Sequence, residues 1–481
     1  MTTILLANVG VRDVQLDGEL LQSPRDDGQR LLGEWPDIER RLSLPIIEPL
    51  IAFVRDRWGW PAAVVLFATD QPPSAPAQHR AKDTIHCAEL AKRLLNHRCG
   101  PLQGRVFVRA TRDENPALYD EALGYFKKTF QSGARPFGEA TEAIVSPVGG
   151  TPAMNTGLLL AAAERFGLSC RAIYLAEGAA RPVDMNLGRA LYESRLRRLV
   201  CGHLANHHYA AAKGIMVELG LEETTAAVAL TEYALRRLNF DFDGAVAALD
   251  RAYAEASPAQ RRLMERLSDE ARRLGAGDQR LLLLELARSM EVVFRQGAYL
   301  DYLARLVRFA ENLARYLVET HLPPLRFEAD DPRARSQREE MFQVYPDLLD
   351  YVGQLQVSGQ PLRYTHSNTV TLLALVDYIL ADRPGKPAHW RLGEERRGQV
   401  AEMAGFLRSV QKLIQKRNET MHRFGGASAE TILGLYRQAA GEDRVLEDDL
   451  GRVVRSLLGG EDYGWGVDAA RDAIAGELNA L

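Results

Sequence analysis

The sequence predicts an α/β domain with a parallel sheet, followed by a long all-α part. In the first 180 residues, short apolar runs alternate with stretches of helical periodicity. This alternation is typical of a parallel sheet covered by helices on both faces. After about residue 180 the strand patterns stop, and helical patterns rich in Ala, Leu, Glu and Arg follow. A chain of 481 residues is long enough for two or three domains.

Five apolar runs in the first part are the expected strands, and most of them end in glycine or in turn-forming residues. They cover residues 4–7, 62–68, 105–108, 143–148 and 172–176. The expected helices between them lie at about 37–56, 85–98, 116–130 and 152–166. We therefore expect one α/β domain at 1–180.

The helical part is expected to contain a connector at 181–285 and a terminal domain at 286–481, with the turn at 275–277 as the boundary signal. An apolar stripe at helical spacing from 299 to 317 predicts a core face or a dimer face. A histidine cluster in the connector is compatible with metal by residue type. Packing or surface positions are the stronger interpretation, because nothing fixes a third ligand near Cys201, His203, His207 and His208.

Composition narrows the classes of function. The net charge of -4 gives no global basic field, so any nucleic-acid site is a local patch for a short or single strand. The four cysteines match no zinc spacing, and a disulfide framework is not expected in a chain of this length. No secretory leader pattern and no run of 18 apolar residues is present. We expect a cytoplasmic protein without a membrane segment.

Three of the expected strand ends carry polar or glycine-rich residues, where ligands of parallel sheets bind. These ends are residues 8–13, 69–71 and 146–155. In the third, Gly149 and Gly150 allow close backbone approach, Thr151 suits a helix N-cap, and Pro152 suits the first helical position. A helix starting there directs free N–H groups at an anion. Neither GxGxxG nor GxxxxGK[ST] is present, so the sequence favours a nucleotide-like ligand over NAD or ATP hydrolysis. A turn that only connects two elements is the alternative.

The stretch Lys416–His422 holds residue types suited to RNA cleavage without a metal. His422 can move a proton near neutral pH, Arg417 can stabilise a phosphate, and Asn418 can orient either one. Five helical positions correspond to about 140° around the axis, so Arg417 and His422 do not share one face. One site can use both if the helix ends between them or if two copies meet across a dimer. Gly425-Gly426 predicts a helix end near His422.

Two parts of the chain resemble known families. With Asn8-Val9-Gly10, Thr69-Asp70-Gln71 and the residues 148–155, the first part resembles a CARF domain, a Rossmann-like sensor of cyclic oligoadenylates. With Arg417-Asn418 and His422 followed by Phe424-Gly425-Gly426, the terminal part resembles a HEPN ribonuclease domain. The order CARF, helical connector, HEPN resembles the accessory ribonucleases of type III CRISPR systems, the Csm/Csx group.

This resemblance implies a mechanism and a set of partners. A cyclic oligoadenylate binds across the CARF pair of a homodimer and activates the HEPN pair. The HEPN pair then cuts single-stranded RNA without metal or cofactor and leaves a 2′,3′-cyclic phosphate. The family favours cyclic tetra-adenylate slightly over hexa-adenylate, and no stable association with the CRISPR effector complex is expected. In this assignment His422 is the general acid or base, Arg417 stabilises the transition state, and Asn418 orients the pair.

The resemblance also implies candidate activator contacts at the strand ends. They are Asn8, Gly10, Arg12, Thr69, Gln71, Gly149, Gly150, Thr151, Met154 and Asn155. Some CARF domains also cut their own activator, and Thr151 and Asn155 are the residues to test for this activity. Two other functions stay open: a ligand-sensing module whose helical part recruits a partner or nucleic acid without catalysis, and a metabolic α/β enzyme with a helical cap. Missing cofactor motifs count against the last.

Overall fold

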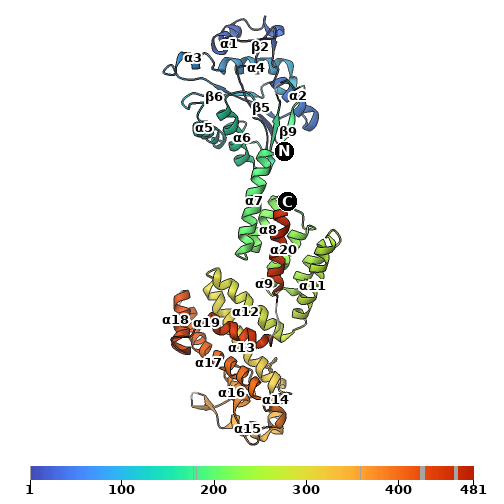
Figure 1. Ribbon diagram of the computed structural model, residues 1–481, viewed down its shortest axis with the longest axis vertical. Helices are drawn as coiled ribbons and strands as arrows, with labels where there is room; N and C mark the ends of the chain where they lie inside the picture. The colour runs from blue at the N-terminus through green and yellow to red at the C-terminus, as the bar shows by residue number, and fades with distance from the viewer. Residues whose placement is uncertain are drawn as a thin grey trace. The chain divides into compact units, whose positions relative to one another are not determined.

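The structure of the chain is a computed structural model that describes residues 2–176, 178–179, 181–357, 359–422, 428–459 and 464–480. For residues 187–188, 191, 412, 414–422 and 479–480 it describes the backbone alone. The chain forms two compact units, Met1–Arg198 and Leu199–Leu481 (Figure 1).

The first unit is built on a six-stranded sheet with the strand order β6-β5-β1-β7-β8-β9. Its strands are β1 (Thr3–Asn8), β5 (Ala63–Thr69), β6 (Val106–Thr111), β7 (Glu142–Ser146), β8 (Cys170–Tyr174) and β9 (Val183–Met185). Neighbours pair in parallel from β6 to β8, and β9 pairs antiparallel with β8 at the edge. All five predicted strands are present. The expectation that strands stop at residue 180 is wrong, because the short edge strand β9 is too exposed and brief to show a period.

Helices cover both faces of this sheet. On one face lie α1 (Pro24–Gly33), α2 (Ile47–Trp58) and α4 (Ile85–Arg98), and on the other lie α5 (Tyr119–Gln131) and α6 (Pro152–Phe166). Side chains of β1 alternate between the two cores: Leu5 packs with the first set and Leu6 with the second. Burial on both faces is the reason why the strands appear as continuous apolar runs in the sequence.

The connection between β1 and β5 differs from the prediction. In place of one helix at 37–56, the chain forms α1, a three-stranded sheet of β2 (Gln15–Leu16), β3 (Glu19–Leu20) and β4 (Leu42–Ser43), and then α2. Two-residue strands carry no periodic signal, and β4 with the short 3-10 turn Glu39–Arg41 before it takes the place of the first part of the helix expected at 37–56. A short helix, α3 (Ala77–Arg80), precedes α4.

The order in which the chain adds strands reverses at β1. After β1 the chain forms β5 and β6 on one side, and then places β7 on the other side. The register pairs Ala7 with Ser146, so the residues after both strands leave the sheet at the same edge. In doubly wound sheets, the carboxyl ends on either side of such a reversal form the ligand crevice.

The second unit is almost entirely helical, and the residues of α7 (Leu187–Ala205) fall in both units. A hairpin of β10 (Gln356–Val357) and β11 (Gln360–Pro361) interrupts it. Its further helices are α8 (Tyr209–Glu218), α9 (Ala226–Leu238), α10 (Phe242–Ala252), α11 (Pro258–Gly275), α12 (Gln279–Arg295), α13 (Tyr299–His321), α14 (Pro332–Val344), α15 (Pro346–Gly353), α16 (Thr369–Leu380), α17 (Glu394–His422), α18 (Ala429–Ala440), α19 (Leu446–Leu458) and α20 (Gly466–Ala480).

Two apolar cores hold these helices together. One contains side chains of α12 to α19, and the other contains side chains of α7 to α11 together with α20. The C-terminal helix α20 therefore returns to pack beside α9 (Figure 1). The stripe at 299–317 faces the first core through Leu306, Phe309 and Leu313, which identifies it as a core face. The predicted division at 285 stays a prediction, although a turn does separate α11 from α12 at the expected place.

Candidate functional site

Two glycine turns meet at the carboxyl ends of β1 and β7. Gly149 and Gly150 have φ angles of +82° and +64°, which favour glycine. A Cβ atom on Gly149 would lie 2.6 Å from the backbone oxygen of Asn8, and one on Gly10 would lie 2.7 Å from the backbone nitrogen of Gly150. Both positions therefore require glycine for close backbone approach, as the sequence pattern suggested for the second turn.

Asn8 connects β1 to α6 at this place. Its side chain is buried, and its Nδ2 donates a hydrogen bond to Oδ1 of Asn155 at 2.8 Å. The Asn8 Oδ1 atom is buried and accepts no hydrogen bond within the described residues. A buried acceptor without a donor is costly, so this oxygen has unused capacity for a donor that enters the site. The structure thus brings together two predicted contacts from opposite ends of the domain sequence.

Asp13 lies beneath both turns, and the sequence interpretation considered it only as a pairing partner for Arg12. Asp13 is fully buried and accepts a hydrogen bond from the backbone N–H of Gly10. Its Oδ2 lies 2.7 Å from where a Cβ of Gly149 would be, and its Oδ1 has no partner among the described atoms. Burial raises the pKa of Asp13 to about 7, although the Gly10 hydrogen bond lowers it. Arg12 itself is exposed.

Thr151 caps α6, as predicted. Its Oγ1 accepts a hydrogen bond from the backbone N–H of Met154 at 3.1 Å and donates one to the backbone oxygen of Pro116. Pro152 follows at the first helical position. The Met154 side chain is buried in the core that α5 and α6 share, so it contributes to packing under the turn.

A pocket of about 280 Å³ opens beside these turns. Four of the predicted contacts line it, namely Thr69, Gln71, Gly150 and Thr151. Its other lining residues are Val9, Val11, His79, Lys82, Thr84, Asn115, Pro116 and Ala117. Lys82 is exposed and makes no ion pair within the described part of the chain, so it adds a free positive charge. The sequence interpretation missed Lys82 and Asn115, because it singled out neither the turn before α4 nor the loop after β6.

The loop after β5 is held by Asp83. This carboxylate is fully buried and accepts hydrogen bonds from the backbone N–H of Gln71 at 2.9 Å and from its Nε2 at 3.1 Å. Arg25 of α1 donates to the same carboxylate at 2.7 Å. Thr69 and Thr84 each donate a backbone N–H to the hydroxyl oxygen of the other at 3.2 Å. Thr69 and Gln71 are therefore fixed by the protein before any ligand binds.

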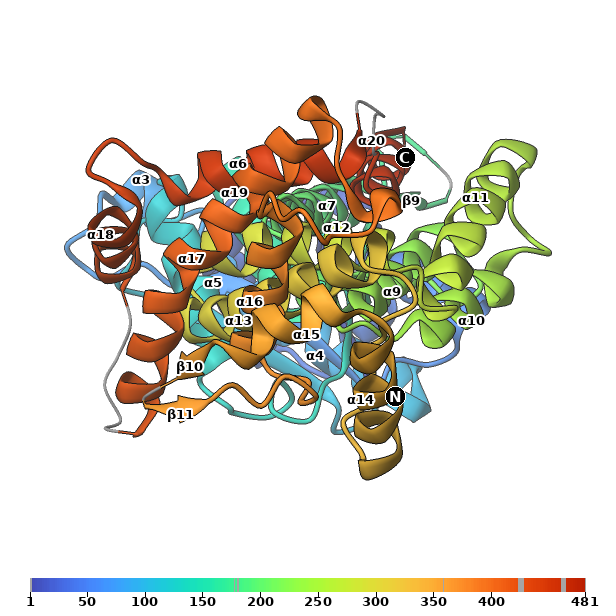
Figure 2. The same cartoon turned by 90° about the horizontal axis from the view of Figure 1, so that it is seen from below.

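The predicted catalytic residues lie at the C-terminal end of α17. Its earlier part is anchored in the core by Val400, Phe406 and Val410, and the helix packs against α16 and α18 (Figure 2). The helix runs without a break from Glu394 to His422, so the angular separation of about 140° between its positions 417 and 422 applies. The side chains of Arg417, Asn418 and His422 lie outside the described residues, as do residues 423–427. Their roles stay predictions.

The histidines of the predicted connector pack against neighbouring side chains. His207 is buried, its Nδ1 lies 3.0 Å from the hydroxyl of Tyr209, and burial lowers its pKa. The rings of His203 and His208 are 6.0 Å apart. Within the described ranges, no group of three or more His, Cys, Asp or Glu side chains is arranged to hold a metal ion. None of the described helices is both long and apolar enough to cross a bilayer.

The fold of the chain is found among solved structures. No protein-family model matches the sequence, and no curated protein matches it. The fold is similar to that of Csm6 from Enterococcus italicus, solved with cyclic hexa-2′-fluoro-hexa-dAMP bound. The alignment covers 99% of this chain and 100% of that chain, with a TM-score of 0.56 and 14% sequence identity. The predicted fold class, an α/β domain with a largely parallel sheet followed by a long helical part, is confirmed.

Proposed function

We propose that the chain is a ribonuclease activated by a cyclic oligoadenylate, of the kind that accompanies type III CRISPR systems. The observation that carries this proposal is the fold shared along the whole chain with Csm6, whose structure holds a cyclic hexanucleotide analogue. Glycine turns at the end of β1 and after β7, and the sequence Arg417-Asn418 with His422, add support at the two expected places.

The pocket at the strand ends suits one nucleotide of a ring. Its volume of about 280 Å³ is too small for a whole cyclic oligonucleotide, so a ring would occupy equivalent pockets of two copies across a two-fold axis. The backbone at Gly150, the N-terminus of α6 and the charge of Lys82 offer sites for phosphates. Val9, Val11 and Pro116 offer apolar surface for a base.

The size of the ring and the cleavage of the ring by the chain itself are two separate questions. The family resemblance slightly favours cyclic tetra-adenylate, whereas the Csm6 structure contains an analogue with six nucleotides. For cleavage of the activator, Thr151 is a poor candidate nucleophile, because its hydroxyl already accepts from Met154 and donates to Pro116. Asn155, whose Oδ1 is bonded to Asn8, is the remaining candidate for orienting the ring.

The chemistry assigned to the end of α17 is transfer within the RNA strand. The 2′-oxygen attacks the adjacent phosphorus, the 5′-oxygen leaves with a proton, and a 2′,3′-cyclic phosphate forms. His422 moves the proton, Arg417 stabilises the charge on the phosphate, and Asn418 orients them. Since positions 417 and 422 are about 140° apart around the axis of a regular helix, a composite site built from two copies of α17 is the arrangement that uses both residues.

The test is cleavage of a fluorescent single-stranded RNA in EDTA, with and without cyclic tetra- or hexa-adenylate. Cleavage that appears with only one ring would support the activator, its size and the metal-free chemistry together. A thermal shift without cleavage would move the function to a sensing module without catalysis, because a bound ligand stabilises the folded state by mass action. The proposal would be refuted if neither ring produced a thermal shift or RNA cleavage.

A further inference from the structure

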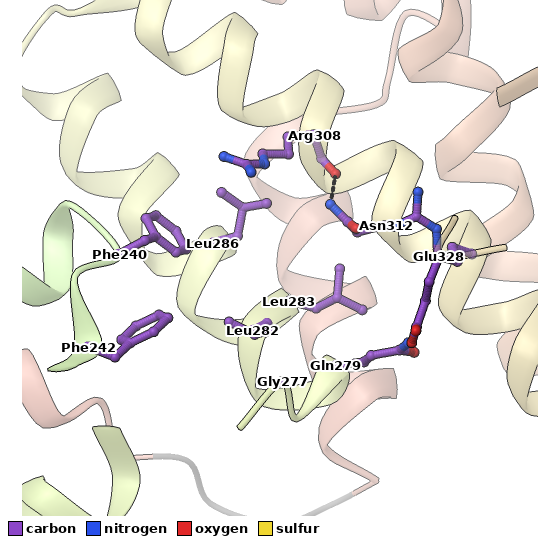
Figure 3. Close-up of a pocket in the computed structure, with 11 residues that line it drawn as sticks. Phe240, Phe242, Gly277, Gln279, Leu282, Leu283, Leu286, Arg308, Asn312 and Glu328 are labelled. Carbon is purple, nitrogen blue, oxygen red and sulfur yellow. Dashed lines mark hydrogen bonds between the residues drawn. The ribbon is translucent and has the colours of Figure 1, made fainter. Parts of the chain in front are cut away.

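A second pocket, of about 410 Å³, lies within the helical unit and uses no residue of α17 or of the strand ends. It lies between the loop from α9 to α10, the first turns of α12 and the middle of α13 (Figure 3). Pockets of this size that combine an apolar surface with a few polar groups are typical small-molecule sites. Neither the strand-end site nor the predicted RNA site accounts for it.

The apolar side of this pocket is formed by two phenylalanines and a leucine floor. The rings of Phe240 and Phe242 are 5.9 Å apart with an interplanar angle of 70°, and Leu282, Leu283 and Leu286 of α12 lie beside them (Figure 3). Phe240 has a φ of +59°, a left-handed conformation that bulky residues rarely adopt. Such backbone strain is concentrated at ligand sites, where the surrounding structure maintains it.

Arg305 of α13 holds Phe240 in its strained backbone conformation. The guanidinium of Arg305 lies over the Phe240 ring, 5.7 Å from its centroid. The same guanidinium donates long hydrogen bonds of 3.4 Å to the backbone oxygen of Leu238, at the end of α9. The aromatic wall is therefore fixed before any ligand enters, which lowers the entropic cost of binding.

The polar side of the pocket carries two arginines of α13. Arg308 is exposed, and its guanidinium has no hydrogen-bond or ion-pair partner in the described part of the chain. Arg315 donates to Oδ1 of Asn312 at 3.2 Å and forms no ion pair with a described residue. The two arginines are seven positions apart, so they lie two turns apart on nearly the same face of the helix. Among the described residues, neither of these two cations at the pocket forms an ion pair with a carboxylate.

Two further lining residues, Gln279 and Glu328, supply hydrogen-bond acceptors. Nε2 of Gln279 donates to Glu319 at 3.0 Å and to Glu328 at 3.3 Å, and this fixes the amide and leaves its carbonyl oxygen as an acceptor. Glu328 also lines the pocket and is exposed (Figure 3). These acceptors suit the amino group of a nucleobase. They do not suit a second anionic group.

We propose that this pocket binds a nucleotide, with a planar base against Phe240 and Phe242 and a phosphate on Arg308 and Arg315. Aromatic rings stack with bases of any sequence, and arginine forks match phosphate oxygens. The volume holds one nucleotide and excludes a whole cyclic oligonucleotide. Free nucleotides and a nucleotide of an RNA strand share this chemistry. The inference does not depend on the proposed ribonuclease activity.

Isothermal titration calorimetry of the full chain with 5′-AMP tests the assignment, with adenosine and inorganic phosphate as partial ligands. Arg308→Gln is expected to weaken 5′-AMP binding about tenfold, the loss typical of a charge-assisted hydrogen bond, and to leave adenosine unchanged. Phe242→Ala is expected to weaken both ligands. The matched control is Arg251→Gln, which removes an exposed arginine of α10 that does not line the pocket. Asn155→Ala tests whether the heat comes from the strand ends.

Each outcome of this experiment supports or overturns the proposed nucleotide site. Weaker binding of 5′-AMP by Arg308→Gln and Phe242→Ala, with unchanged binding by Arg251→Gln and Asn155→Ala, supports the site. Equal binding of inorganic phosphate and 5′-AMP, or equal binding by all variants, overturns it, as does the absence of binding. Tighter binding of a 2′-O-methylated triadenylate, which cannot be cut, identifies RNA as the source of the nucleotide. Equal or weaker binding identifies a free nucleotide.

Discussion

Replacing Asp13 with asparagine is expected to remove a pH dependence from the stability of the first unit. Burial raises the pKa of Asp13 from an ordinary value of 3.8 to about 7, despite the hydrogen bond from the Gly10 N–H. Between these two values the folded state holds a proton that the unfolded chain releases. The free energy of unfolding therefore falls as the pH rises from about 4 to about 7, and it levels off above the folded pKa.

The size of this effect follows from the two pKa values. The interval from 3.8 to about 7 is roughly three pH units, and at about 1.4 kcal/mol per unit it corresponds to about 4 kcal/mol at most. This is a large share of the stability of an ordinary domain, about 5–15 kcal/mol. Asparagine keeps an oxygen for the Gly10 N–H and cannot ionise. The variant is thus expected to lose the slope without losing the glycine turn.

The assay is a urea titration at several pH values between 5 and 8, with a hydrogen-exchange pulse read on peptides from β1 and β7. The difference between the wild type and Asp13→Asn isolates Asp13 from all other titrating groups. The wild type should lose stability relative to the variant as the pH rises, mostly below pH 7. A constant difference across this range would refute the reasoning, because it would mean that Asp13 is ionised in the folded state throughout.

Three further substitutions test other parts of the chain. Gly149→Ala should abolish binding of the cyclic oligoadenylate at the strand ends, since its Cβ would lie 2.6 Å from the backbone oxygen of Asn8. The control is Gly18→Ala, at a position with a φ of +83° and open space around it. Equal affinity of the two variants for the ring would contradict the predicted clash. Arg237→Gln should cost about 3–5 kcal/mol in chemical unfolding, because it removes the cationic partner of the buried Glu285 carboxylate. The neighbouring Arg236→Gln, 48% exposed, should cost far less, and similar losses would argue against a buried ion pair. His422→Ala should abolish RNA cleavage and keep the activator-induced thermal shift, whereas full cleavage would remove it from the mechanism.

The sequence correctly predicted those elements whose signal is carried by neighbouring residues. All five predicted strands form, and β1, β5 and β7 are buried along nearly their whole length, as the division of Leu5 and Leu6 between two cores illustrates for β1. Thr151 could be predicted as an N-cap because the cap and its proline lie side by side in the sequence. By contrast, the edge strand β9 and the small sheet of β2, β3 and β4 have two or three residues per strand, too few for a period.

Contacts between distant segments could not be predicted in the same way. The packing of α20 against α9 depends on a buried group: Arg237 pairs with Glu285, which also accepts a hydrogen bond from Nε1 of Trp465 at 2.8 Å. In the sequence these are ordinary helix residues and a tryptophan in a turn. Nothing in their spacing indicates that they meet, because the pairing depends on helix packing and not on periodicity.

Asp13 illustrates how a site residue escapes sequence reasoning and why it matters to the site. Gly10 and Gly149 lie far apart in the sequence, and only the parallel register of β1 and β7 brings their turns together. Asp13 lies where these turns meet, so its burial, its raised pKa and the need for glycine share one cause. A shift of this register would separate the turns and expose the carboxyl group. A ligand that contacts both turns therefore binds only the native pairing, and its binding energy adds to the stability of the strands that form the site.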